Sequence, residues 1–139
     1  MGLTYADIEL VNSGDIVLFN RGYIKENEIR KEKVNALVDS GANMLCINEK
    51  IKSQLGLDNY GYRTAQLADG QIKKLEVVGP VDIRFLNRST TTRAMVLPGD
   101  AEILLGVIPL EDLDVILDPL KQTLALPPDR PYLGQYSLK

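Results

Sequence analysis

The tripeptide Asp39-Ser40-Gly41 is the part of the sequence with the clearest chemical potential. A carboxylate placed after a buried strand can serve as half of an acid–base pair. Asp, Ser and Gly are also frequent in ordinary turns. Apolar runs at residues 34–38 and 44–47 flank this loop, so we expect the loop to be buried. A buried acid needs hydrogen bonds or a function. Because the chain offers only one such element, a second carboxylate would have to come from a second copy of the chain.

The cysteine and histidine content narrows the chemistry further. The chain has one cysteine and no histidine, which excludes a disulfide framework within the chain and leaves Cys/His metal sites without ligands. Catalysis by Ser–His–Asp or Cys–His groups requires an imidazole. Cys46 lies in an apolar run and is expected to be a buried, inert thiol. Acid–base chemistry must therefore use carboxylates, lysines or tyrosines, and we expect neither a metal nor a cofactor.

Length and charge indicate one soluble globular domain. The 139 residues are 45% hydrophobic and 25% charged with a net charge of −3, so the basic surface of a nucleic-acid-binding protein is missing. No run approaches the roughly 20 apolar residues that span a membrane, and the N-terminus lacks the pattern of a signal peptide. We therefore expect a cytoplasmic protein with no nucleic-acid or membrane partner. Residues 1–126 are predicted to form the domain, and residues 127–139 a Pro-rich C-terminal tail.

The spacing of apolar residues and turn residues predicts a mainly β fold with few helices. A short helix should follow Asn48 as its cap, bury Ile51 and Leu55, and end at Gly56. A second helical turn should begin at Pro109. We expect a closed or strongly curled barrel. The predicted strands are residues 6–11, 15–19 (joined to the first by a turn at 12–14), 29–38, 81–85, 91–97 and 103–105, with a terminal hairpin of 115–117 and 123–126.

Two further elements accompany Asp39. The segment Ala68-Asp69-Gly70-Gln71 predicts a two-residue turn of the Asp-Gly type, which would join residues 63–68 to 71–77 in a hairpin. Such a hairpin could project over a cleft. Later in the chain, the apolar run 103–105 ends in Gly106, ahead of the predicted helical turn.

These three elements, in this order, resemble the retropepsin-like aspartic proteases. The quoted motifs are Asp39-Ser40-Gly41-Ala42, the hairpin, and Leu104-Leu105-Gly106 with a short helix after it. The likeness covers roughly residues 28–119 and is closer to the bacterial single-domain members than to the viral enzymes. It implies an acid-protease barrel with one or two short helices, a half-site per chain, a homodimer, and a peptide or protein substrate.

The resemblance also implies roles for individual residues. Asp39 from each of two subunits would share one proton, so that one carboxylate activates a water and the other donates to the peptide carbonyl. Ser40 would hydrogen-bond across the interface, and Gly41 would let backbone approach the carboxylates. The hairpin 63–77, called the flap below, would close over the peptide. The implied substrate-binding residues are Ala42, Asn43, Ala68, Asp69 and Gly70.

Two departures from the viral pattern leave alternatives open. Viral enzymes carry Asp and Arg where this chain has Asn43 and Val107, and that ion pair helps to lock the viral dimer. This chain lacks both the Asp and the Arg, so neither charge is left without its partner. A non-catalytic module for peptide binding or dimerisation is the alternative to an endopeptidase. A third hypothesis is a plain β domain in which Asp39 is a buried turn acid. The remaining acids of interest are expected to be solvated: Asp82, Asp112, Asp114 and Asp118.

Overall fold

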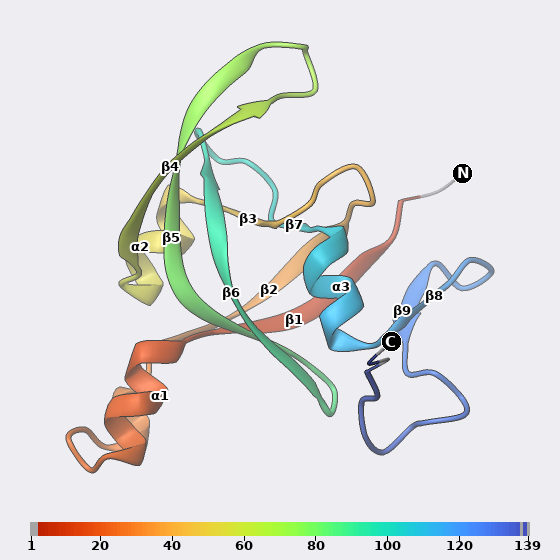
Figure 1. The fold of residues 1–139 in the computed structure, drawn as a ribbon, viewed down its shortest axis with the longest axis horizontal. Coiled ribbons are helices and arrows are strands. Elements are labelled where there is room, and N and C mark those ends of the chain that lie inside the picture. Colours follow the sequence, from red (N-terminus) through yellow and green to blue (C-terminus); the bar gives the residue numbers. More distant parts are fainter. Residues whose placement is uncertain (1–2, 137, 139) are drawn as a thin grey trace.

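A computed structural model describes residues 3–136 and 138 of the chain (Figure 1). Residues 1, 2, 137 and 139, which belong to the predicted domain and tail, lie outside the described residues. Among the described residues, no helix is long and apolar enough to cross a membrane. The strands are β1 (Tyr5–Asn12), β2 (Lys31–Val38), β3 (Leu45–Asn48), β4 (Asp58–Gln66), β5 (Ile72–Phe85), β6 (Arg88–Leu97), β7 (Leu104–Leu105), β8 (Ile116–Asp118) and β9 (Thr123–Ala125). The helices are α1 (Ser13–Asn20), the 3-10 turn η1 (Glu26–Glu28), α2 (Glu49–Leu55) and α3 (Val107–Leu113).

The main sheet closes on itself. Its strand order is β1-β2-β7-β3-β6-β5-β4, and β1 also pairs with β5 from Glu9↔Arg84 to Asn12↔Val81. Six strands therefore form a ring, and β4 lies outside it on the far edge of β5. The prediction of a closed barrel is confirmed. The predicted terminal hairpin is also present, as the separate two-stranded sheet of β8 and β9.

Alternating residues of these strands fill the barrel. On β1 the side chains of Ile8 and Leu10 point inward, and on β5 those of Val81 and Ile83 do the same. Each fully buried aliphatic side chain contributes roughly 1.5–3 kcal/mol to the stability of the fold. The fully enclosed side chains of the core include Leu10, Leu45, Ile47, Leu55, Ile83, Leu105 and Leu113.

The prediction of a strand at residues 15–19 is wrong, because these residues belong to α1. The Asn12 side chain accepts a hydrogen bond from the Asp15 N–H (3.0 Å) and donates one to the Leu55 carbonyl (2.8 Å). Asp15 in turn accepts two hydrogen bonds from the Arg30 guanidinium, each 2.9 Å long. A capped first turn with a buried, paired acid selects a helix over the hairpin that the apolar run suggested.

The two other helices agree with the sequence pattern. Asn48 caps α2 by accepting the Ile51 N–H at 3.0 Å, and Gly56 ends the helix in the left-handed conformation (φ 61°, ψ 41°). A substituent on Gly56 would also collide with the Arg30 guanidinium. Helix α3 begins at Val107, two residues ahead of the predicted start at Pro109.

The flap is a twisted hairpin that stands out from one end of the barrel (Figure 1, top). Its turn has three residues instead of the predicted two. The Leu67 carbonyl accepts the Gly70 N–H (2.9 Å), and the Leu67 N–H donates to the Gln71 carbonyl (2.8 Å). Only Gly70 has a positive φ (88°), whereas a two-residue Asp-Gly turn needs a positive φ at Asp69 as well. Asp69 instead accepts the Gln71 N–H at 2.9 Å.

Candidate active site

Asp39 directly follows β2 and opens the loop 39–44 that leads into β3. Its N–H donates to the Leu105 carbonyl of β7 at 3.1 Å, which ties the loop to the barrel. Its carboxylate Oδ1 accepts the Gly41 N–H at 2.8 Å, and this bond orients the side chain. A Cβ on Gly41 would lie 3.1 Å from the same Oδ1 atom. Glycine therefore leaves the space that the carboxylate occupies.

Gly106 and the first turn of α3 hold the loop from the other side. The Val107 N–H donates to the Ala42 carbonyl (2.9 Å), and the Ile108 N–H donates to the Asn43 carbonyl (3.0 Å). A Cβ on Gly106 would lie 2.4 Å from the Met44 carbonyl oxygen and 2.7 Å from that of Ala42. Only glycine allows α3 to come this close. The apolar–apolar–Gly element thus positions the loop that carries Asp39, a role that spacing along the chain does not reveal.

The expectation that the loop is buried is wrong for the single chain. Asp39 is half-buried, and Ser40, Gly41 and Asn43 are exposed. The apolar flanks are nevertheless buried, because Leu45 is a core residue of the barrel. The flanks belong to strands whose side chains point inward, whereas the loop leaves the barrel at the strand ends. The carboxylate of Asp39 is therefore open to the surroundings of the chain.

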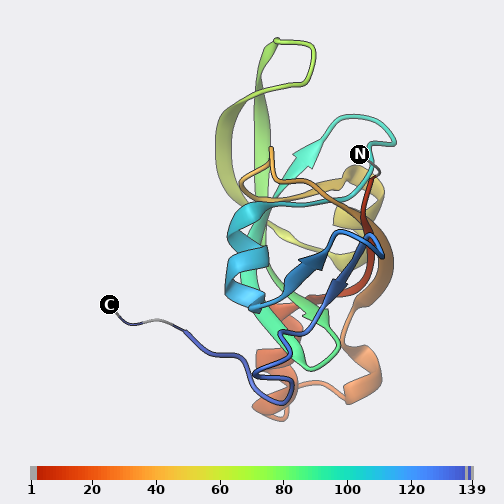
Figure 2. The ribbon, with the colours of Figure 1, turned by 90° about the vertical axis from the view of Figure 1, so that its right-hand side faces the viewer.

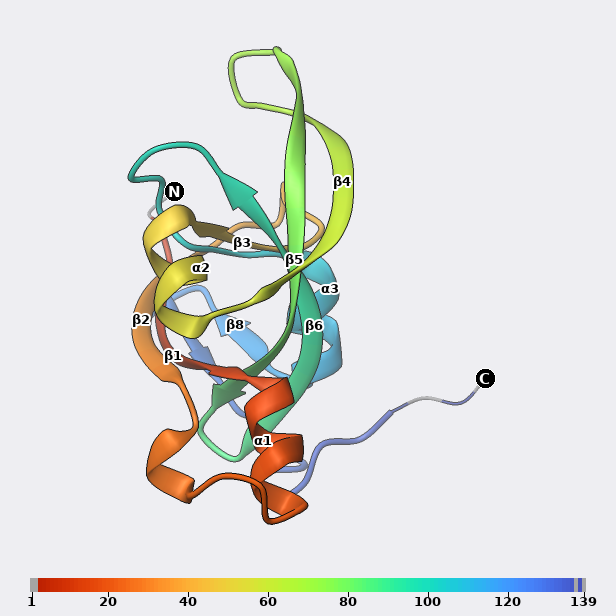
Figure 3. The same cartoon turned by 90° about the vertical axis from the view of Figure 1, so that its left-hand side faces the viewer.

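The flap and the loop 39–44 lie toward the same end of the barrel, and α1 lies at the opposite end. Figures 2 and 3, which view the chain from its two sides, agree on this arrangement. The predicted substrate-binding residues of the flap tip, Ala68, Asp69 and Gly70, are all exposed. The structure therefore brings the two groups of predicted site residues to one end of the molecule, while Asp69 and Asp39 are not hydrogen-bonded to each other.

A second apolar cluster connects the flap to the strand that follows the loop. This cluster was not predicted from the sequence, although alternation along the flap strands places Ala65 and Leu67, and Leu75 and Val77, at two-residue spacing. The cluster packs the base of the flap against β3 and β6. Its buried members are Cys46, Leu75, Val77 and Met95, and its partly buried members are Met44, Ala65, Leu67, Leu97 and Leu104.

Cys46 belongs to that cluster and is buried, as expected. Burial, together with the nearby Asp39 carboxylate, raises the pKa of the Cys46 thiol to about 11. The thiol therefore stays protonated at neutral and acidic pH. The protonated thiol is a poor nucleophile.

One acid outside the loop departs from expectation. Asp114, predicted to be solvated, has a side chain only 11% exposed. Arg130 donates to it from Nε (2.7 Å) and Nη2 (2.8 Å). These hydrogen bonds, with one from the Gln135 N–H, lower the pKa of the Asp114 carboxyl to about 2. The partner comes from the C-terminal segment, which sequence spacing does not place next to α3.

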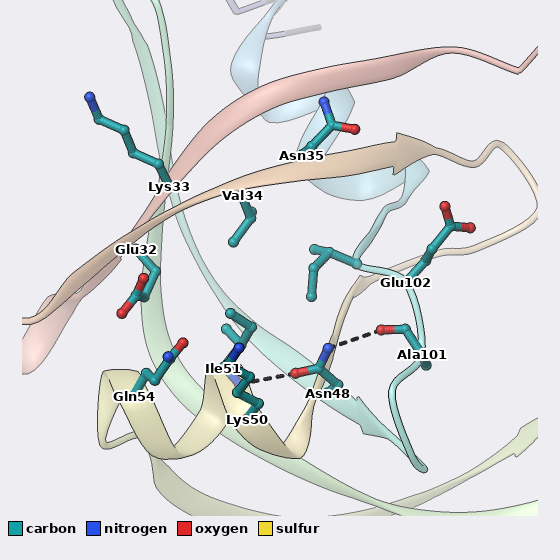
Figure 4. Close-up of a pocket in the computed structure, with 11 residues that line it drawn as sticks. Glu32, Lys33, Val34, Asn35, Asn48, Lys50, Ile51, Gln54, Ala101 and Glu102 are labelled. Atoms are coloured by element: carbon teal, nitrogen blue, oxygen red, sulfur yellow. Dashed lines mark hydrogen bonds between the residues drawn. The ribbon is translucent and has the colours of Figure 1, made fainter.

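The surface has a shallow pocket of about 400 Å³ away from Asp39 (Figure 4). It lies between β2, α2 and the segment before β7. Asn48, its best-placed polar side chain, is already used, because its amide donates to the Ala101 carbonyl at 3.0 Å and its oxygen caps α2. Among the described residues, no group of three or more Cys, Asp or Glu side chains is arranged to hold a metal ion. The pocket contains no predicted site residue.

Comparison with known proteins places this geometry in a family. The family described as "Aspartyl protease" matches residues 25–108, a span that includes Asp39, the flap and Gly106. The chain belongs to the aspartyl protease family. A search of curated proteins finds no match.

A solved structure shows the same fold. The retroviral protease-like domain of Ddi1 from Leishmania major is 16% identical to the chain, with 90% of each chain covered and a TM-score of 0.52. The EIAV protease complexed with the inhibitor HBY-793 is 25% identical, with 58% of this chain and 77% of that chain covered and a TM-score of 0.49. The predicted fold class, a mainly β retropepsin-like barrel with few short helices, is confirmed.

Proposed function

We propose that the chain is an aspartic endopeptidase that acts as a homodimer, with one Asp39 loop from each subunit, on extended peptide segments. The observation that carries this proposal is the way in which hydrogen bonds hold Asp39 and its loop in place. Its carboxylate is oriented by the Gly41 N–H, and its loop is fixed by two hydrogen bonds from the first turn of α3. The bond from the Gly41 N–H also occurs in ordinary turns, as at Asp69, so the support comes from the two hydrogen bonds from α3 and from the close approach of Gly106 to the loop. Membership of the aspartyl protease family adds independent support.

Two Asp39 carboxylates at a shared site would hold one proton between them, because two adjacent charges are costly. The ionised carboxylate takes a proton from a water as that water attacks the peptide carbonyl carbon. The protonated carboxylate donates its proton to the carbonyl oxygen, which gives a neutral tetrahedral intermediate. Ser40 hydrogen-bonds across the interface, and Gly41 leaves room for backbone to approach.

Substrate binding is assigned to the loop and the flap tip. Ala42 and Asn43 follow the catalytic tripeptide, their carbonyls accept hydrogen bonds from α3, and Asn43 is exposed. The flap tip closes over the peptide and excludes water, which strengthens the electrostatic interactions inside. The proposed contacts at the tip are Ala68, Asp69 and Gly70.

The surface around the loop supports a second copy as the partner. Ile108 is 59% exposed, although its N–H is bonded to the Asn43 carbonyl beside the catalytic tripeptide. Leu117 and Leu120 of the β8–β9 hairpin are 50% and 95% exposed. The hairpin and the loop both face the viewer in Figure 2. Covering these apolar side chains would stabilise a dimer that lacks the viral ion pair.

A non-catalytic module is the second candidate, favoured by the replacement of the viral Asp and Arg by Asn43 and Val107. In that case the same barrel would bind a peptide or dimerise, and the Asp39 carboxylates would not assemble into a working pair. This candidate predicts a monomer, or a dimer that cleaves no member of a broad peptide library.

Specific activity measured against protein concentration separates the two candidates. For a homodimeric endopeptidase, cleavage per chain falls on dilution through the dimer dissociation constant, and a statine-type inhibitor blocks it. Sedimentation or light scattering on the same samples should show the dimer over the active range. Cleavage per chain that stays constant while the protein sediments as a monomer would contradict the proposal. A stable dimer with no cleavage at mildly acidic pH would favour the module.

A further inference from the structure

The C-terminal segment is anchored to the end of α3 in spite of its lack of helix and strand. The carboxylate of Asp114, which follows α3, accepts two hydrogen bonds from the Arg130 guanidinium and a third from the Gln135 N–H (2.9 Å). We call residues 127–136 the C-terminal strap. Because the strap crosses back to the residue that ends α3, it fixes the C-terminal end of that helix.

The first residue of β6 and the turn before it hold the strap from a second side. Arg88 is only 3% exposed, and its Nη2 donates to the Arg130 carbonyl at 2.6 Å while its Nε donates to the Asp114 carbonyl at 3.1 Å. The Asn87 amide donates to the Pro131 carbonyl at 2.8 Å. A buried arginine that bonds to both partners of an ion pair joins strap, helix and barrel into one polar network.

The opposite end of α3 holds the Asp39 loop. The N–H groups of Val107 and Ile108 donate to the loop carbonyls, as described above. Helix α3 has only seven residues and buries Pro109 and Leu113, so a tilt at one end moves the other. The helix is therefore a short rigid link, with the strap at its C-terminal end and the catalytic loop at its N-terminal end.

We infer that the C-terminal strap is a positioning element for the Asp39 loop, and that Arg130 and Asp114 are positioning residues that act through α3. The coupling between strap and loop follows from the contacts alone. Its consequence for cleavage rests on the proposed function. Without the Arg130–Asp114 contact, the end of α3 keeps only Arg88 and its own buried side chains as anchors, so the helix tilts more easily and the hydrogen bonds from Val107 and Ile108 to the loop open more often.

The Arg130–Asp114 pair that anchors the strap persists in acidic solution. The pKa of the Asp114 carboxyl is lowered to about 2, chiefly by the hydrogen bonds from Arg130, with Arg88 as the second cation beside it. Asp129 pairs with Arg130 on its exposed side, and the neighbouring Asp112 carboxylate raises the pKa of the Tyr136 hydroxyl. A lowered pKa means that the stabilisation is complete above the ordinary value of 3.8 and is lost as the pH falls through about 2. The strap therefore stays in place at mildly acidic pH.

Amide hydrogen exchange in the variant Arg130→Gln tests the inference without any need for cleavage. We expect the Val107 and Ile108 amides to exchange about tenfold faster or more than in the wild type, because a charge-assisted anchor is lost. The amides of the paired strands β5 and β6 should change much less. The matched control is Arg30→Gln, which breaks an equally bidentate pair with Asp15. This pair lies at the end of the barrel opposite the Asp39 loop. The control should leave the Val107 and Ile108 amides at their wild-type rates relative to the barrel amides.

Unchanged exchange at Val107 and Ile108 in Arg130→Gln, or a uniform increase over all amides, would overturn the inference. Arg130→Lys keeps the charge and loses the bidentate geometry, so it should give an intermediate increase in exchange. It replaces the glutamine variant in the test if that variant folds poorly. In an active protein, Arg130→Gln should also lower kcat by more than it raises KM, because the reacting carboxylate is displaced. If the protein cleaves nothing, the exchange result still decides the inference, so its failure is distinct from that of the proposed function.

Discussion

The variant Asp39→Asn is expected to lose peptide cleavage, with kcat/KM lower by roughly 10³-fold or more. An amide neither takes a proton from the attacking water nor shares one with a second carboxylate. The change is isosteric, and the amide oxygen still accepts the Gly41 N–H, so the loop and the fold should be unaffected. The measurement is steady-state cleavage of a peptide substrate at mildly acidic pH, with the fold checked by thermal unfolding.

A matched control for this variant is Asp7→Asn. Asp7 is exposed on β1 and accepts a hydrogen bond from Asn35 at 2.8 Å, so the control makes the same chemical change away from the loop. We expect wild-type cleavage from the control. Cleavage that survives in Asp39→Asn and remains sensitive to a statine-type inhibitor would rule out Asp39 as the catalytic acid.

The variant Gly106→Ala is expected to lower the free energy of unfolding by about 3 kcal/mol, the upper end of the usual cost of overpacking. The added methyl would lie 2.4 Å from the Met44 carbonyl oxygen and 2.7 Å from that of Ala42. Both atoms belong to backbone, which cannot rotate away as a flexible side chain would. Either α3 or the loop must move, so cleavage should fall as well. Urea denaturation measures the loss of stability.

Gly134→Ala provides the comparison, because a Cβ there meets its nearest atoms at 3.8–3.9 Å, an ordinary contact. Its stability should stay within about 0.5 kcal/mol of the wild type. If Gly106→Ala were as stable as Gly134→Ala, the close approach of α3 to the loop would be wrong, and with it the assignment of Gly106 as the residue that positions Asp39.

Local sequence signals predicted the elements whose causes are local. Alternation at Val81, Ile83 and Phe85 indicated a half-buried strand, and Asn48 and Gly56 marked both ends of α2. Helix α1 was missed because its apolar run suits a strand equally well. The deciding contact is the pair between Asp15 and Arg30, which are 15 residues apart. The flap turn differed for a local reason, since the Asp69 carboxylate accepts the Gln71 N–H in a three-residue turn that needs no positive φ at Asp69.

The candidate site, too, was predictable where its causes lie in the local sequence and not where they lie in distant contacts. The order of the motifs indicated Asp39 and Gly106, but only the folded chain shows that Gly106 lies against the carbonyls of Ala42 and Met44. Apolar flanks suggested a buried loop, whereas the flanks enter the barrel and the loop leaves it. The link between Asp114 and Arg130 was not predictable, because a charge pair between a helix end and an irregular segment has no characteristic spacing.

The proposed site with two Asp39 residues predicts that cleavage depends on the square of the fraction of intact chains. Wild-type protein and Asp39→Asn would be unfolded together, refolded, and assayed at a constant total concentration well above the dimer dissociation constant. With equal amounts of the two chains, random pairing predicts about one quarter of the wild-type activity, since only dimers of two intact chains carry both carboxylates. Activity of about one half, falling in proportion to the wild-type fraction, would show that each chain works with its own Asp39 alone and would contradict the shared site.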